Sequence, residues 1–227
     1  MPSSLELVEL VVRTMAETAI RNEAYFSDLD AVMGDADFGT SLAGGFRAVL
    51  NAWDGYDHSS ASALLLNVAS SITGNTGGCS GPVWGTLFMR CGMTFRGKTE
   101  LTLADVIAAL KNAIEGISKR GGAVVGDKTL LDALNDIVLS LESSFTASAS
   151  DSASSSSASA SSGLSSSEIL QKATNAAVEC RETTKSWIAK RGRQSFTGER
   201  SIDTYDPGIV AVGEMMKDIV SALSGVI

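Results

Sequence analysis

Residues 29–41 read LDAVMGDADFGTS and place three carboxylates, at Asp30, Asp35 and Asp37, within eight residues. Aspartate and glycine are poor helix formers, so we predict a bend between two helices here. Carboxylates held in one bend repel one another unless a cation lies between them, and clustered oxygen ligands suit Mg²⁺ or Ca²⁺. The bend is therefore a candidate Mg²⁺ site whose other ligands are nucleotide phosphates. A helix cap followed by a turn would give a similar pattern.

An EF-hand loop does not account for these aspartates. If Asp35 were the first ligand, the twelfth position would be Phe46, where the loop requires glutamate, and the invariant glycine position would be Thr40. The bend is therefore interpreted as a carboxylate cluster of another kind.

A second informative stretch, residues 73–86, reads TGNTGGCSGPVWGT. Its glycines predict a loop, and Ser80 and Pro82 predict the N-cap and first turn of a helix that continues over residues 83–95. A glycine loop that leads into a helix N-terminus presents unpaired backbone N–H groups, which favour phosphate. The alternative is a flexible turn before a well-capped helix. Residues 126–129 (GDKT) only resemble the end of a Walker A motif, and no GxGxxG joins a strand to a helix.

Four basic residues gather in residues 190–202, KRGRQSFTGERSI, within a chain whose formal net charge is −8. Such a loop can supply counter-charge to phosphates, or it can be a solvated surface loop. The acidic balance of the chain argues against a general nucleic-acid binder and against an anionic membrane surface as a partner.

Cysteine usage and the N-terminus bear on the compartment. Cys79, Cys91 and Cys180 lie far apart and form no CxxC, as is typical of free thiols in a reducing compartment. The N-terminus has an amphipathic pattern unlike a signal peptide, and no apolar run approaches the length of a membrane span. We therefore expect a soluble, cytoplasmic protein. The only histidine, His58, lies in a polar connecting segment and is not expected to be catalytic.

Apolar residues recur at helical spacing in eight segments, and few segments alternate as strands do. The predicted helices cover about 4–23, 39–53, 60–72, 83–95, 103–119, 130–141, 168–190 and 209–223. We predict an all-α fold, an eight-helix antiparallel up-and-down bundle or barrel, in one domain over residues 1–227. Loops after every second helix then share one end, which groups residues 30–41, 74–81, 120–129 and 190–208.

Residues 143–167 are a low-complexity Ser/Ala segment. Such a composition cannot form a packed core, so we predict a flexible loop, partly helical through its alanines, at the opposite end of the bundle from the other motifs. No catalytic role is expected for it.

Together these motifs resemble a known family. The aspartate bend with Gly39, the loop at 77–86, the GDKT segment with Asp132, and the segments 192–201 and 206–208 are similar, in order and spacing, to the L subunit of dihydroxyacetone kinase. The resemblance covers nearly the whole chain. It implies an eight-helix antiparallel barrel with ADP or ATP bound at one end. It also implies that two Mg²⁺ ions, held by the three aspartates, bridge the nucleotide phosphates.

The resemblance further implies which residues contact the nucleotide. Ser80 and its glycine neighbours match phosphate-binding positions, and Gly121 and Leu130 match positions near the adenine. Arg193 matches a catalytic position that closes over the nucleotide. The complete set of expected nucleotide-binding residues is Phe38, Gly39, Thr40, Ser41, Gly78, Cys79, Ser80, Gly81, Gly121, Leu130, Arg193, Asp206, Pro207 and Gly208. The family usually has histidine where this chain has Phe38, which puts local contacts and the fit to a partner in question.

The resemblance implies a phosphotransferase subunit that is active only with partners. A K subunit would hold dihydroxyacetone or a related short ketose covalently through its own histidine. A phosphotransferase M subunit would rephosphorylate ADP that stays bound as a cofactor. A homodimer within a hetero-oligomer is expected, without nucleic acid or membrane. The alternatives are an ATP-exchanging subunit, a nucleotide-loaded regulator of a transcription factor, and a degenerate bundle that binds no nucleotide.

Overall fold

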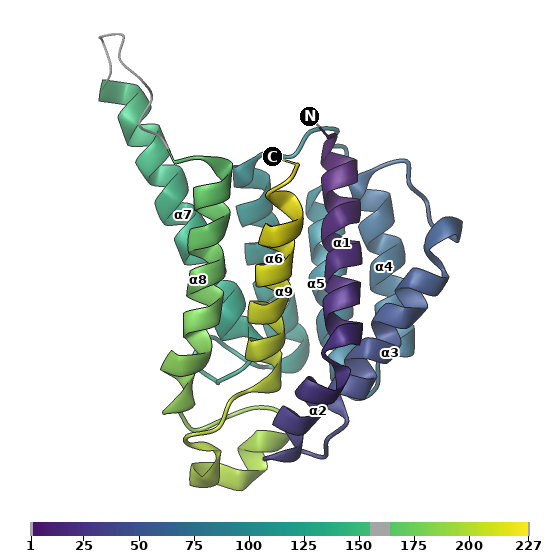
Figure 1. The fold of residues 1–227 in the computed structure, drawn as a ribbon, viewed down its shortest axis with the longest axis vertical. Coiled ribbons are helices and arrows are strands. Elements are labelled where there is room, and N and C mark those ends of the chain that lie inside the picture. Colours follow the sequence, from purple (N-terminus) through teal and green to yellow (C-terminus); the bar gives the residue numbers. More distant parts are fainter. Residues whose placement is uncertain (1, 155–163, 227) are drawn as a thin grey trace.

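The computed structural model describes residues 2–154 and 164–226, with side chains described up to residue 147 and again from residue 164. Within these ranges the chain forms nine α-helices, two 3₁₀ helices and no strand (Figure 1). The elements are α1 (Ser4–Arg21), α2 (Glu23–Ala31), α3 (Phe38–Asn51), η1 (Trp53–Gly55), α4 (Ala61–Asn75), α5 (Ser80–Thr94), α6 (Leu103–Gly121), α7 (Leu130–Ser154), α8 (Ser166–Lys185), η2 (Arg193–Ser201) and α9 (Pro207–Leu223).

Eight of the helices close into an antiparallel barrel (Figure 1). From α3 to α9 each helix packs against the next one in the chain, and α1 packs against both α9 and α3. The predicted all-α up-and-down barrel is confirmed, although the count differs by one. The additional helix, α2, lies at one end of the barrel beside α3. No helix in the described ranges is long and apolar enough to span a bilayer.

Local sequence signals account for many helix boundaries. Helices α1, α6 and α8 each begin with a capping box, in which the N-cap hydroxyl and an acidic side chain three residues later bond to each other's backbone. Helix α6 ends at Gly122, whose φ of 66° is the left-handed conformation that glycine adopts most readily. The helix therefore ends where glycine lets the chain turn.

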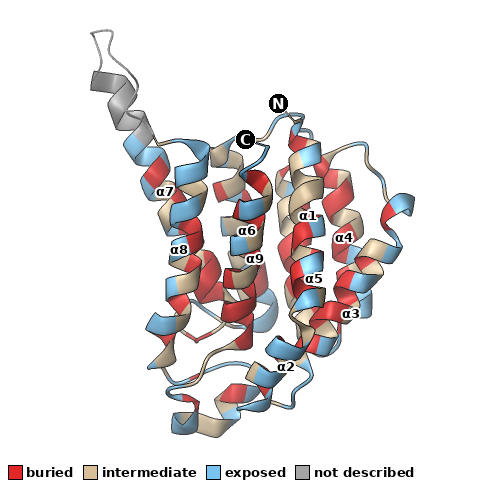
Figure 2. Cartoon of the chain, in the orientation of Figure 1, coloured by how far each residue is buried: buried red, intermediate tan, exposed pale blue. Residues whose placement is uncertain are grey.

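Buried apolar side chains line the inside of the barrel, while the outward faces are exposed or intermediate (Figure 2). Near the end that carries α2, Phe46 makes edge contacts with Trp84 and Phe88, with ring centroids 6.3 and 6.1 Å apart. Glycines bring α3 and α5 close to the end of α4. A Cβ atom on Gly45 or Gly85 would lie 1.9 Å from a threonine hydroxyl oxygen of α4 or its C-cap. Small residues at these positions thus hold the three helices together.

Three local predictions need correction. Residues 23–31 form α2, although only two of them are buried and their helical periodicity is weak. Helix α5 begins at Ser80, so Ser80 is not its N-cap; Cys79 has that position and makes no side-chain capping bond. Helix α8 ends at Lys185 rather than near residue 190.

The Ser/Ala segment is partly helical, as its alanines predict, and its helical part is an extension of α7. Residues 143–154 continue α7, because alanine is the strongest helix former and the preceding helix is already nucleated. Residues 155–163 lie outside the described part of the chain. At the other end of the segment, Ser165 and Glu168 form the capping box that starts α8.

Candidate functional site

The four predicted loops meet at one end of the barrel, where α3, α5, α7 and α9 begin (Figure 1). Arg193 forms an ion pair with Asp35, and the backbone N–H of Lys190 donates to Asp127 O at 3.0 Å. A Cβ atom on Gly77 would lie 2.7 Å from Ser41 Oγ. The predicted shared end is therefore confirmed by contacts between loops that are far apart in the sequence.

Asp30 lies in the last turn of α2 and is 7% exposed. Its Oδ2 accepts hydrogen bonds from the backbone N–H groups of Asp37 at 3.1 Å and Phe38 at 3.3 Å. Two residues in the chain between Asp30 and Asp37 shape this turn. Gly34 packs so closely that a Cβ atom on it would lie 2.0 Å from Asp30 Oδ1, and Ala36 adopts a φ of 63°. The turn is thus folded around the Asp30 carboxylate.

This turn brings Asp35 and Asp37 beside Asp30, so that one oxygen from each carboxylate lies within 4.8 Å of the others. Desolvation raises the pKa of Asp37, and the negative charge of Asp35 raises it further. A cation among the three oxygens would relieve this repulsion. Asp35 and Asp37 are exposed and Asp30 is buried, so the cluster opens to solvent on one side. The donor set is all carboxylate oxygen, which fits a hard cation such as Mg²⁺.

Arg193, at the start of η2, reaches this cluster from the distant basic loop. Its Nη1 lies 2.8 Å from Asp35 Oδ2, and its Nη2 lies 3.8 Å from Asp37 Oδ2. Its positive charge lowers the pKa of Asp37 against the effects of desolvation and Asp35. The basic loop is therefore more than a solvated surface feature, because one of its guanidinium groups faces the carboxylates.

The helix N-termini at this end differ in how they are capped. Helix α7 is capped by Thr129 Oγ1 and α9 by the Asp206 carboxylate. Helices α3 and α5 have no side-chain capping bond. Apart from the Phe38 N–H, which donates to Asp30, the N–H groups in the first turn of each therefore remain available for an anion, with the positive end of the helix dipole behind them. Expected nucleotide-binding residues that lie here are Gly39, Thr40, Ser41, Gly78, Cys79, Ser80 and Gly81.

Phe38 packs inward rather than standing at the cluster. It is partly buried, and its ring meets Phe26 edge-on with centroids 6.3 Å apart. Its backbone N–H supports Asp30. The aromatic ring thus contributes to packing between α2 and α3, and the turn does not depend on the identity of this side chain.

The remaining expected nucleotide contacts form a second group on the same end. Leu130 begins α7 and Gly208 is the second residue of α9, and a Cβ atom on Gly208 would lie 3.3 Å from Leu130 Cβ. Pro207 is buried, and Asp206 accepts from Ile209 N–H at 2.8 Å. Gly121 is exposed at the end of α6. The polar contacts of Asp206 therefore serve the cap of α9 and do not join this group to the aspartates.

Comparison with known proteins identifies the family. A family model described as the DAK2 domain matches residues 32–221. This chain belongs to the DAK2 domain family. It is 31% identical over 193 residues to the ADP-binding subunit of the PEP-dependent dihydroxyacetone kinase of Escherichia coli, covering 85% of each chain. It is 30% identical to the ADP-binding subunit of the PTS-dependent dihydroxyacetone kinase of Lactococcus lactis, covering 82% of this chain and 81% of the relative.

The fold of this DAK2 domain also matches a solved structure. The dihydroxyacetone kinase of C. freundii in complex with AMP-PNP and Mg²⁺ has a TM-score of 0.68 and 22% sequence identity, covering 97% of this chain. The match spans 34% of that longer chain. The likeness establishes the shared helical barrel.

Lys128 is a prominent residue of this DAK2 domain whose role the local sequence pattern does not show. Lys128 was noted only as part of an incomplete Walker A motif, but it is completely buried and donates to three backbone carbonyls. It therefore cannot face a phosphate. Asp132 lies beside it and accepts from the N–H groups of Gly126 at 2.5 Å and Thr129 at 2.7 Å. The sequence signal that points to this buried lysine is its place between Asp127 and Asp132, next to the start of α7.

Proposed function

We propose that this chain is the nucleotide-binding subunit of a dihydroxyacetone-type kinase, with Mg²⁺ and ADP or ATP bound at the end of the barrel that carries the aspartates. Phosphoryl transfer needs positioning and charge neutralisation more than covalent catalysis by the protein. The observation that supports the proposal most directly is the juxtaposition of three carboxylates, Arg193 and two uncapped helix N-termini.

Each part of this arrangement matches a part of a Mg-nucleotide. Asp30, Asp35 and Asp37 would hold Mg²⁺, which when bound supplies positive charge to phosphate oxygens. The first turns of α3 and α5 would donate backbone N–H groups to the phosphates. Arg193 would exchange its contact with Asp35 for the transferred phosphate and stabilise charge that develops there. Gly121 and Leu130 would lie near the adenine. A groove of about 450 Å³ runs between α6 and α7 and is lined by apolar side chains such as Val124 and Leu131 and by charged ones such as Lys119.

The phosphoryl acceptor must be held by another protein in this proposal. The only histidine of the sequence, His58, lies just after η1, outside the four loops that meet at the site. Its ring nitrogens contact Glu9 Oε1 at 2.5 Å and Trp53 O at 3.0 Å. It is therefore not free to react with a ketone. A K-type subunit would bind dihydroxyacetone or a related ketose and dock over the aspartate end.

The two named relatives also suggest how the nucleotide is used, because they are described as ADP-binding subunits of PEP- or PTS-dependent kinases. We infer that ADP stays bound in this chain as a cofactor and is rephosphorylated in place by a phosphotransferase M subunit. An ATP-exchanging subunit would use the same carboxylates and the same arginine.

The decisive experiment is to purify the protein in Mg²⁺, denature it, and identify any released nucleotide by chromatography. Stoichiometric ADP that survives extensive dialysis is expected. Asp35→Ala should release it, whereas Asp28→Ala, an exposed aspartate on α2, should not. An empty protein that binds Mg-ATP reversibly would instead identify an ATP-exchanging subunit. An empty protein that binds neither nucleotide would overturn the proposal.

Transfer itself is tested by mixing the protein with a K subunit, an M subunit and dihydroxyacetone. The proposal predicts product only when all are present, and none from this chain alone. If the nucleotide-loaded chain binds a transcription factor and no K subunit, the regulatory alternative replaces the kinase.

A further inference from the structure

Lys128 is a lysine with no exposed surface. Its Nζ donates hydrogen bonds to the backbone oxygens of Lys185 at 3.2 Å, Trp187 at 3.1 Å and Ser201 at 2.7 Å. An ammonium group has three N–H donors and no acceptor, so these carbonyls use its full capacity. All three belong to one stretch of chain, from the end of α8 to the end of η2.

The backbone around Lys128 directs its side chain inward. Lys128 has a φ of 62°, which non-glycine residues adopt only when their surroundings impose it. Its neighbours are held on both sides: Asp127 O accepts from Lys190 N–H at 3.0 Å, and Thr129 N–H donates to Asp132 at 2.7 Å. The GDKT segment is therefore a fixed support against which the basic loop is built.

We call residues 186–202 the arginine segment, because they carry Arg191, Arg193 and Arg200. The two ends of this segment lie together. Asp203 N–H donates to Lys185 O at 2.9 Å, and Ala189 N–H donates to Ser201 Oγ at 2.9 Å. We call the place where these two ends meet the neck of the arginine segment. Lys128 bonds to carbonyls at both ends, so its ammonium group closes the neck.

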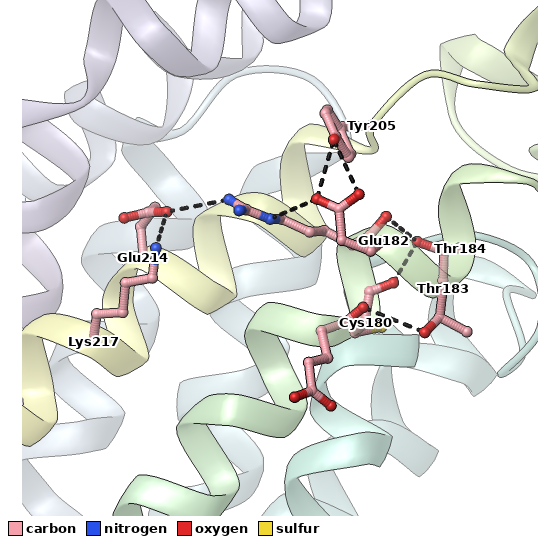
Figure 3. A network of polar contacts seen from close by, with 9 residues as sticks. Cys180, Glu182, Thr183, Thr184, Tyr205, Glu214 and Lys217 are labelled. Carbon is pink, nitrogen blue, oxygen red and sulfur yellow. Dashed lines mark hydrogen bonds and ion pairs between the residues drawn. The ribbon is translucent and has the colours of Figure 1, made fainter.

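A second anchor fixes the segment close to Arg193. Gln194, which is buried, donates to Tyr205 O at 3.0 Å. The Tyr205 hydroxyl in turn points at the two carboxylate oxygens of Glu182 on α8, at 3.1 and 3.2 Å (Figure 3). Arg193 itself has a side chain that is 59% exposed. Its position therefore depends on the segment that carries it.

We propose that Lys128 is a positioning residue that holds the neck of the arginine segment closed and so places Arg193 at Asp35 and at a phosphate bound beside it. The role in placing Arg193 at Asp35 follows from the geometry. The role toward phosphate rests on the proposed function. A neutral side chain of similar length, such as methionine, would fill the space but remove three hydrogen bonds. Trp187 O would lose its donor, whereas Lys185 O would keep Asp203 N–H and Ser201 O would keep the Thr204 hydroxyl.

The surroundings of Lys128 suit a charged ammonium group despite its burial. Burial lowers the pKa of Lys128, while Asp206 and Asp203 act in the opposite direction. Lys185 O lies in the last turn of α8, at the negative end of the helix dipole. These groups stabilise a positive charge where the two ends of the segment meet.

Limited digestion with trypsin tests the closure without any nucleotide, because the arginine segment contains Lys190, Arg191, Arg193 and Arg200. In Lys128→Met, cleavage within the segment should be faster by about tenfold or more, since proteolysis follows the population of the open form. The control, Lys172→Met, removes an exposed lysine of α8 and should cleave as the unaltered protein does. Equal cleavage rates in Lys128→Met and the control would overturn the proposal.

A double-mutant cycle tests the connection to Arg193. If Lys128 acts through Arg193, adding Lys128→Met to Arg193→Ala should lower phosphoryl transfer by less than about twofold beyond Arg193→Ala alone. Losses that multiply in the double variant would overturn the role toward Arg193. Loss of ADP binding in Asp35→Ala is measured separately and tests the proposed function. Failure of the proposed function can therefore be distinguished from failure of the positioning role of Lys128.

If Lys128→Met does not fold, hydrogen exchange on the unaltered protein decides the question. The N–H groups of Ala189, Lys190 and Asp203 lie in irregular backbone, yet each has a bonded partner at the neck. Their exchange should be slowed by about tenfold or more relative to an unstructured chain. Exchange at the unstructured rate would show that the neck is open and would overturn the proposal.

Discussion

Arg193 Nη1 lies 2.8 Å from Asp35 Oδ2, so the acidic bend near the start of the chain and the basic loop near its end meet in one ion pair. The pair is exposed to solvent, and pairs of this kind contribute little to stability. Its importance is that it aligns a movable positive charge with a cluster of carboxylates. A bound Mg-nucleotide would stand between these groups.

Replacing Arg193 should therefore impair transfer more than binding. In Arg193→Ala we expect phosphoryl transfer with the partner subunits to fall by about 100-fold or more, because a charge aimed at the transferred phosphate is lost. Bound ADP should remain, since the aspartates and the helix N-termini are unchanged. Arg96→Ala, which removes an exposed arginine after α5, is the matched control for loss of one positive charge. Arg193→Ala with full transfer activity would contradict the assignment.

Asp30 should determine whether Mg²⁺ stabilises the protein. Asp30→Asn keeps an oxygen for the N–H groups of Asp37 and Phe38 but removes the buried charge. For the unaltered protein, Mg²⁺ at about 100 times its Kd should raise the free energy of unfolding by about 2.7 kcal/mol. This gain should disappear in Asp30→Asn and persist in Asp28→Asn. Thermal unfolding with and without EDTA measures it, and an equal gain in both variants would argue against the site.

Gly34 should not tolerate a side chain. A Cβ atom there would lie 2.0 Å from Asp30 Oδ1 and 2.9 Å from Asp30 O, so Gly34→Ala must displace the carboxylate or the turn. We expect a loss of about 1–3 kcal/mol in the free energy of unfolding, together with weaker Mg²⁺ binding. Gly55 has open space around its Cβ position, so Gly55→Ala is the control. Urea unfolding and a Mg²⁺ titration measure the two effects, and unchanged Mg²⁺ affinity would show that the turn adapts.

Asp206 should make stability depend on pH. Burial raises its pKa from 3.8 to about 7, against the opposing hydrogen bond from Ile209 N–H. Between these values the unfolded chain has lost the proton that the folded chain still holds. The contribution of Asp206 to stability therefore falls as the pH rises through this window and is lowest above it.

The variant Asp206→Asn keeps a good N-cap for α9 but cannot ionise. In EDTA it should gain about 1 kcal/mol or more over the unaltered protein at pH 8, and the two should converge near pH 4. Urea unfolding of both proteins across this pH range gives the difference in their free energies of unfolding. The effects of other titrating groups cancel in this difference. Parallel pH profiles would show that Asp206 ionises normally.

The parts of the fold that could be predicted are those that depend on near neighbours in the chain. Apolar residues at helical spacing identified the eight barrel helices. Helix α2 was missed because Phe26 is its only buried apolar residue and carries no periodic pattern. Partial helix in the Ser/Ala segment was predicted from its alanines, but the continuation of α7 over residues 143–154 was not, because serine-rich composition favours a loop.

The candidate site was predictable in part for the same reason. Asp30, Asp35 and Asp37 are close in sequence, so any compact bend brings their carboxylates together. The alternation of loops in an up-and-down barrel placed the glycine loop and the basic loop at the same end. The role of Lys128 was not predictable, because its three partners come from the segment between α8 and α9, whose path no local pattern describes.

By itself, the amino-acid sequence determined the eight barrel helices, the acidic cluster and the end of the barrel at which the motifs gather. Each of these depends on residues a few positions apart, where helical periodicity and turn chemistry act. Only the tertiary structure decided that Arg193 faces Asp35 and that the N-cap residues of α3 and α5 make no side-chain capping bond. It also decided that Lys128 bonds to the segment between α8 and α9. These relationships join distant segments, and the packing of the closed barrel sets the distances between them.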